Sequence, residues 1–115
     1  MFTPADDEGY RELLHGVRMK PLAWGDRTLL AEFRLASGAV IPVHSHPQEQ
    51  TGTLVSGVLE FVIADERRIA RAGDGWCLPP GTPHGVEVLE EAEVIEVFSP
   101  VREDYLPVTT GDGGR

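Results

Sequence analysis

Apolar and polar residues alternate in short runs along most of the chain. Val86 and Val88 flank Glu87, and further along Val97 follows Glu96 in the same manner. An alternation with a period of two puts apolar side chains on one face of a β-strand and polar side chains on the other. The pattern therefore predicts half-buried strands rather than amphipathic helices.

Turn-forming residues separate these runs. The 13 glycines and 9 prolines are spread along the chain, as expected of many strands joined by tight turns. A hairpin turn is predicted at Ser56 and Gly57. Residues 9–16 carry the only helical pattern and could equally lead into the first strand. The runs predict about nine strands, at residues 15–24, 27–35, 39–46, 49–55, 58–63, 67–72, 76–79, 84–89 and 93–99.

A chain of 115 residues with 41% hydrophobic residues suits one domain with one core. The strand pattern predicts an all-β fold, either a sandwich or a small barrel. We expect this barrel to span residues 11–107. The polar segment 1–10 and the glycine-rich tail 108–115 are expected to be flexible.

Charge and composition narrow the set of partners. The formal net charge is −9 and the basic residues form no cluster, which argues against a nucleic-acid partner. No apolar run approaches the ~20 residues of a membrane-spanning helix, and the acidic N-terminus does not resemble a signal peptide. Cys77 is the only cysteine, so no internal disulfide can form. We therefore expect a cytoplasmic protein with no membrane partner.

Two of the 4 histidines, His44 and His46, lie two positions apart and would project from the same face of a strand. Gln50 has the same parity, and His84 follows a predicted turn at residues 79–83. Neutral imidazole is the commonest side-chain ligand of divalent transition metals. These residues could surround one metal ion, whereas histidines on an exposed loop would be the ordinary alternative.

The spacing around these residues resembles the first motif of the cupin superfamily, G-x5-H-x-H-x3-E-x6-G. The matching positions are Gly38, His44, His46, Gln50 and Gly57. The one departure is Gln50 in place of glutamate. Glutamine offers a neutral oxygen, which leaves the full charge on a bound cation and favours Lewis-acid chemistry or the capture of an anion. The alternative is that Gln50 binds only a water molecule on the metal.

A second stretch resembles the other cupin motif, G-x5-P-x-G-x2-H-x3-N. The matching positions are Gly73, Pro79, Gly81 and His84, and Val88 replaces the usual asparagine. The resemblance implies a single-domain cupin β-barrel, which is a double-stranded β-helix or jelly roll.

The resemblance also implies a cofactor. In cupins a metal is held inside the barrel, and the motif positions carry this role over to His44, His46, Gln50 and His84. The cofactor would be one divalent transition metal, namely Zn, Ni, Fe, Mn or Co. Four protein ligands on an octahedral ion leave places for a small anionic metabolite. Small cupins often pair through sheet edges, so a homodimer is expected.

The last strand offers further candidates. Glu96 and Phe98 share one face by parity, and Arg102 follows Pro100. This order resembles the end of the small pectin-degradation cupins, which convert unsaturated uronates to linear keto sugars and carry aspartate where this chain has Glu96. The resemblance implies that Glu96 and Arg102 are catalytic and that Phe98 and Arg102 bind substrate. From the residues alone, Phe98 could be core and Arg102 could lie in a solvated turn.

We therefore expect a metal-dependent, isomerase-like enzyme that acts on an acidic sugar or a keto acid. The expected reaction is ring opening and tautomerisation of an unsaturated uronate. One alternative is a metal-dependent dioxygenase, since three histidines and a glutamine on Fe(II) also suit oxygen chemistry. The other alternative is a non-catalytic cupin that binds a small metabolite.

Overall fold

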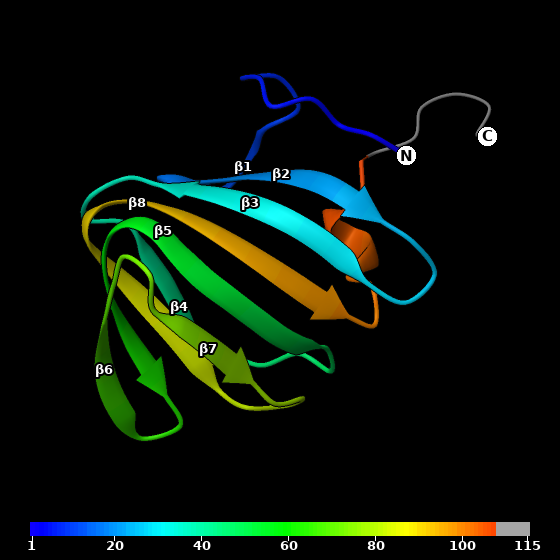
Figure 1. The fold of residues 1–115 in the computed structure, drawn as a ribbon. Coiled ribbons are helices and arrows are strands. Elements are labelled where there is room, and N and C mark those ends of the chain that lie inside the picture. Colours follow the sequence, from blue (N-terminus) through cyan, green and yellow to red (C-terminus); the bar gives the residue numbers. More distant parts are fainter. Residues whose placement is uncertain (108–115) are drawn as a thin grey trace.

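The computed structural model describes residues 1–107 as an all-β fold with one short 3-10 helix (Figure 1). The tail expected to be flexible, residues 108–115, lies outside the described residues. Within the described part, no helix is long and apolar enough to cross a membrane. The elements are β1 (Arg11–Leu14), β2 (Val17–Trp24), β3 (Leu29–Leu35), β4 (Val40–His44), β5 (Glu49–Ile63), β6 (Glu66–Arg71), β7 (Gly75–Leu78), β8 (His84–Ser99) and η1 (Glu103–Tyr105).

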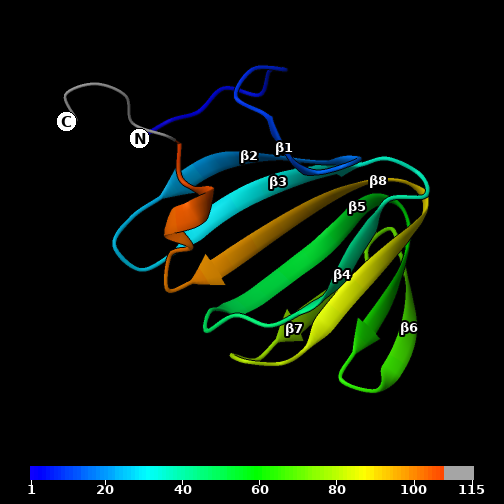
Figure 2. The ribbon, with the colours of Figure 1, turned by 180° about the vertical axis from the view of Figure 1, so that it is seen from behind.

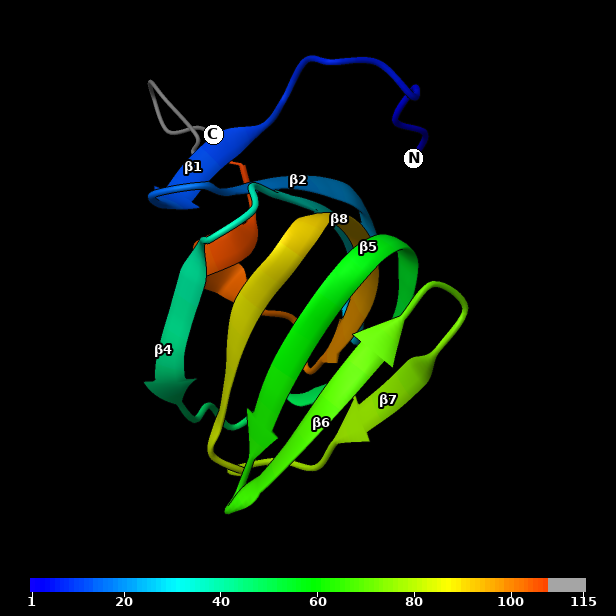
Figure 3. The same ribbon diagram turned by 90° about the vertical axis from the view of Figure 1, so that its left-hand side faces the viewer.

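The long strands β5 and β8 connect two layers of the fold. They pair antiparallel along almost their whole length. In one layer, β3 pairs with the second half of β8 and β7 pairs with the first half of β5. In the other layer, β4 pairs with the first half of β8 and β6 pairs with the second half of β5. Figure 3 shows the strands curving around a common interior, which confirms the predicted all-β barrel.

The structure corrects two predicted strand breaks. Ser56 and Gly57 do not form a hairpin, because β5 continues through them with a shift of register against β8. Gly57 has φ of +95°, and a Cβ there would lie 2.2 Å from the carbonyl oxygen of Glu91. A positive φ suits a β-bulge as well as a hairpin turn. Residues 90–92, also predicted as a break, lie opposite this bulge and belong to the continuous β8.

The end of the chain returns to the barrel. After β8, the helix η1 lies beside the end of that strand and beneath β2 and β3 (Figure 2). The ring of Tyr105 packs there against Phe33 and Phe98, with ring centroids 6.0 and 5.4 Å apart. This return puts residues 102–105 next to the side chains that β8 directs into the barrel.

The first residues of the chain contact β2. Lys20 on β2 is buried, and its Nζ donates to the carbonyl oxygens of Pro4 and Asp6 and to the Asp6 carboxylate, at 3.0, 3.1 and 2.9 Å. A buried ammonium needs such partners to replace its lost hydration. Lys20 therefore ties this segment to the sheet, and the flexibility of residues 1–10 stays a prediction.

Candidate metal centre

Three histidine rings converge at one end of the barrel. His44 ends β4 and His84 begins β8, where the two residues are direct cross-strand partners, and His46 lies in the connection to β5. The ring centroids of His44 and His84 lie 4.4 Å apart, and His46 lies 5.6 and 5.0 Å from them. One ring nitrogen from each residue lies within 4.8 Å of the other two. The three imidazoles could therefore hold one metal ion.

The backbone orients each of these rings. The Nδ1 atom of every ring contacts a backbone carbonyl oxygen at 2.8–3.0 Å. A carbonyl oxygen can only accept, so Nδ1 carries the proton and Nε2 keeps the free lone pair. This is the arrangement in which metal-binding histidines are held in proteins. The pairs are His44 with Pro42, His46 with Gln48 and His84 with Thr82.

The protonation state of the rings also suits a metal. Burial lowers the pKa of His46 and His84 below the ordinary value. The positive charge of Arg102 lowers the pKa of His46 further. Both rings are therefore neutral at pH 7, which is the form that binds metals.

Gln50 is directed into the same space from β5. Its side chain is buried, and its Nε2 donates to Glu96 Oε2 at 2.5 Å. Its Oε1 is therefore the atom that faces the imidazoles, and it lies 2.9 Å from His46 Nε2. Because both of these atoms are acceptors, their lone pairs point at each other. A cation between them would turn this unfavourable contact into a favourable one.

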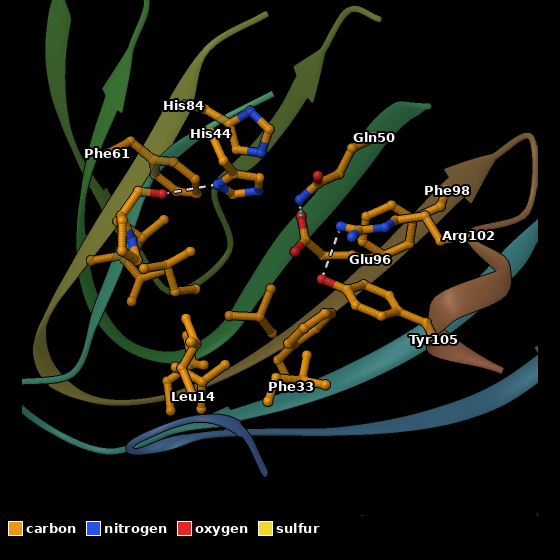
Figure 4. Close-up of a pocket in the computed structure, with 18 of the residues that line it drawn as sticks. Leu14, Phe33, His44, Gln50, Phe61, His84, Glu96, Phe98, Arg102 and Tyr105 are labelled. Atoms are coloured by element: carbon orange, nitrogen blue, oxygen red, sulfur yellow. Dashed lines mark hydrogen bonds between the residues drawn. The ribbon is translucent and has the colours of Figure 1, made fainter. Parts of the chain in front are cut away.

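Glu96 lies on β8 in the wall of the same cavity. Only 8% of the residue is exposed, and its Oε2 also accepts a hydrogen bond from Trp76 Nε1 at 2.9 Å. Burial raises the pKa of the Glu96 carboxyl to about 7, against the opposing effect of hydrogen bonds from Gln50 and Trp76. Figure 4 shows the carboxyl group beside the Gln50 amide, with its other oxygen directed into the cavity. The group can therefore exchange a proton near neutral pH.

Arg102 reaches the cavity from the segment after β8. Its guanidinium lies 3.9 Å from the ring centroid of Tyr105, and Nη1 donates to the Tyr105 hydroxyl at 2.9 Å. Nε and Nη2 donate to the carboxylate of Asp104 at 3.3 and 2.8 Å. Arg102 is therefore a partly buried cation in the wall of the cavity, held from the solvent side by an exposed acid.

The cavity has a volume of about 420 Å³, within the size range of small-molecule sites. Its wall brings together side chains from β4, β5, β8 and the segment that follows β8 (Figure 4). Phe98 is 1% exposed and packs with its ring centroid 6.0 Å from that of His46. Of the residues predicted from the sequence, the wall includes His44, Gln50, His84, Glu96, Phe98 and Arg102.

Comparison with known proteins gives the family. The cupin domain family matches residues 31–98. The chain is 35% identical over 103 residues to the pectin degradation protein KdgF of Dickeya dadantii, and the match covers 88% of this chain and 94% of that protein. The chain belongs to the cupin family.

Solved structures agree with this assignment. The cupin superposes on the structure of KdgF from Halomonas sp. with a TM-score of 0.86 and 30% identity, over 92% of this chain and 98% of that one. It is also 31% identical over 84 residues to the H2HPP isomerase of Bacillus subtilis, which is 72% of this chain and 35% of that protein. The predicted resemblance to small cupins of the pectin-degradation type and the predicted cupin barrel are confirmed.

Two residues of this cupin site were not predicted as part of it. Trp76 reaches Glu96 from β7, and Tyr105 contacts Arg102 from η1. Trp76 begins a strand predicted at residues 76–79, but the pairing of that strand with β5 cannot be read from spacing. Tyr105 follows Arg102 by three positions, and the turn at η1, which was not predicted from the sequence, brings the two side chains together.

Proposed function

We propose that this cupin is a metal-dependent isomerase that acts on a small acid with a neighbouring carbonyl or hydroxyl group. The substrate would be an acidic sugar, such as an unsaturated uronate, or a keto acid. The observation that carries the proposal is the joint position of Glu96, a buried carboxyl with a pKa of about 7, and Arg102 in one cavity. The imidazoles of His44 and His84 line the same cavity. The cavity therefore combines a proton carrier, a cation and a set of metal donors.

His44, His46 and His84, with the Oε1 atom of Gln50, would hold one divalent ion of Zn, Ni, Fe, Mn or Co. The donor set fits such an ion, because three imidazole nitrogens and one amide oxygen face a common space. A bound ion would supply Lewis-acid polarisation of a substrate oxygen. The neutral Gln50 would leave the positive charge of the ion available to an anionic substrate.

Glu96 would move the proton. In an unsaturated uronate, it would take the proton of the anomeric hydroxyl while the bond from the anomeric carbon to the ring oxygen breaks. That bond's electron pair would form an enolate, and Glu96 would return the proton to the carbon at the far end of the double bond. The product is a linear keto sugar of the same composition, so no oxidant or reductant is needed. A carboxyl group that titrates near neutral pH suits both halves of this transfer.

Arg102 would hold the substrate carboxylate, because a guanidinium binds a carboxylate through paired hydrogen bonds. Phe98 would form an apolar wall beneath the bound molecule, next to His46. The names of two relatives support this assignment, since one is a pectin degradation protein and the other an isomerase. The homodimer and the cytoplasmic location stay predictions.

The test is turnover of an unsaturated galacturonate by protein loaded with each candidate metal, followed by proton NMR. We expect conversion to a linear keto sugar that is lost with EDTA and lost in Glu96→Gln. Oxygen consumption by the iron-loaded protein would instead indicate a dioxygenase. Tight binding of the acid without any turnover would indicate a metabolite-binding cupin.

A further inference from the structure

Three residues form one row across neighbouring strands beside the candidate metal centre. Gly52 on β5 pairs with Trp76 on β7 on one side and with Glu96 on β8 on the other. Side chains in one cross-strand row point to the same face of a sheet. Trp76 and Glu96 therefore flank the glycine on the cavity side, and the indole N–H reaches across it to Glu96 Oε2 at 2.9 Å.

The glycine makes this contact possible. A Cβ at Gly52 would lie 2.7 Å from Trp76 Nε1 and 2.8 Å from Glu96 Oε2. Real Cβ atoms do not come this close to other atoms, so any larger residue would push the indole and the carboxyl apart. The row is thus built to hold this one hydrogen bond.

The same oxygen of Glu96 fixes the Gln50 amide. Glu96 Oε2 accepts from Gln50 Nε2 as well as from Trp76 Nε1. With its nitrogen bound to Glu96, the Gln50 amide presents its oxygen to His46 Nε2 at 2.9 Å. A rotated amide would present its N–H groups to the imidazoles, and N–H groups cannot bind a cation.

We propose that Trp76 is a positioning residue of the metal centre, which acts through Glu96 to turn the oxygen of Gln50 toward the imidazoles. The proposal rests on the metal centre proposed above. It also accounts for glutamine at this position, because a glutamate at position 50 would have no N–H to donate to Glu96. Trp76 additionally packs on Phe61, with ring centroids 4.8 Å apart, and a phenylalanine at position 76 keeps an aromatic ring there.

The test is a double-mutant cycle on Co²⁺ affinity, measured by isothermal titration calorimetry. The variants are Trp76→Phe, Gln50→Ala and the two combined, with Trp24→Phe as the matched control at the other tryptophan. We expect Trp76→Phe to weaken Co²⁺ binding about fivefold, as the loss of one orienting hydrogen bond predicts. In the Gln50→Ala background the same substitution should have no further effect, because its route to the metal is gone. Trp24→Phe should bind like the wild type.

Two results would overturn the proposal. One is wild-type affinity in Trp76→Phe, and the other is the same loss in the Gln50→Ala background, which would make Trp76 a merely structural residue. His46→Ala tests the metal centre itself. Unchanged Co²⁺ binding in that variant would show that the ion does not bind at the imidazoles, and the proposed metal centre would then be wrong.

A second measurement does not depend on the folding of Trp76→Phe. In Glu96→Ala, the link between the two donors is lost, and Co²⁺ affinity should fall by a similar factor. The proton resonances of the Trp76 indole N–H and of the Gln50 side-chain amide should both move relative to the wild type. Unchanged affinity in this variant would contradict the proposal.

Discussion

The amide oxygen of Gln50 and the Nε2 atom of His46 lie 2.9 Å apart with their lone pairs facing each other. The Gln50 nitrogen is bound to Glu96, and the other nitrogen of His46 is bound to the carbonyl oxygen of Gln48. While the His46 ring is neutral, neither side chain can turn a donor toward the other without losing a hydrogen bond. A shared cation, either a metal ion or a proton on Nε2, satisfies both atoms.

A carboxylate at position 50 should destabilise the metal-free protein. Gln50→Glu would place a second acid against Glu96, where two carboxylates cannot share a site unless one is protonated. We expect melting temperatures in EDTA to fall more at pH 8 than at pH 5. Gln48→Glu is the matched control, because it adds the same charge where the side chain makes no contact with Glu96. An equal loss in both variants would show that the effect is one of net charge.

The buried acid should also set a pH dependence of stability. The pKa of Glu96 is raised to about 7 from an ordinary value of 4.5, so the folded state holds a proton that the unfolded state releases. Below about pH 4.5 the carboxyl is protonated in both states, and the group's contribution to the free energy of unfolding is fully present. As pH rises from there through 7, the unfolded state ionises first, and the free energy of unfolding falls by about 3 kcal/mol in all. Glu96→Gln should remove this loss, so its advantage over the wild type in urea unfolding with EDTA should grow from pH 5 to pH 8. A constant difference across that range would contradict the raised pKa.

Arg102 should act on substrate binding and not on metal binding. Arg102→Leu should raise KM for an acidic substrate at least about tenfold, because a partly buried charge pair is lost, and should not weaken Co²⁺ binding, because the lost charge is positive. Asp104→Asn is the informative contrast, since Asp104 now occupies Nε and Nη2 of that guanidinium. Removing its charge should lower KM by freeing those donors. Loss of metal binding in Arg102→Leu would show that the role is wrong.

The β-bulge at Gly57, where β5 pairs with β8, should not tolerate a larger side chain. Gly57→Ala would add a Cβ 2.2 Å from the Glu91 carbonyl oxygen at a φ of +95°. We expect a loss of more than about 3 kcal/mol in urea unfolding, as for other backbone clashes. Gly38→Ala is the control, with φ of +86° and open space around the added atom. It should cost about 1 kcal/mol from strain alone, and equal losses would rule out the clash.

Alternation and turn residues were sufficient to predict the fold class and most strand positions. They were not sufficient at Gly57, because its positive φ fits a turn and a bulge equally well. Only the long-range pairing of β5 with β8, which brings Glu91 against this glycine, separates the two. Local signals cannot contain that information.

The histidines illustrate how much of a site can be predicted. The two-residue spacing predicted His44 and His46 on one face of a strand, but β4 ends at His44 and His46 lies in the connection that follows. The motif match gave His84 and Gln50 the same role independently of strand parity. The link from Gln50 through Glu96 to Trp76 could not be predicted, since it depends on three strands lying in register at Gly52. Spacing along one strand carries no information about its neighbours.

The central claim is that one metal ion is bound by three imidazoles and one amide oxygen. The direct measurement is an anomalous difference map at the cobalt edge, from crystals grown with excess Co²⁺. We predict one peak per chain, in contact with the Nε2 atoms of His44, His46 and His84 and with Gln50 Oε1. No peak among these atoms, with the imidazoles apart at full Co²⁺ exposure, would contradict the claim.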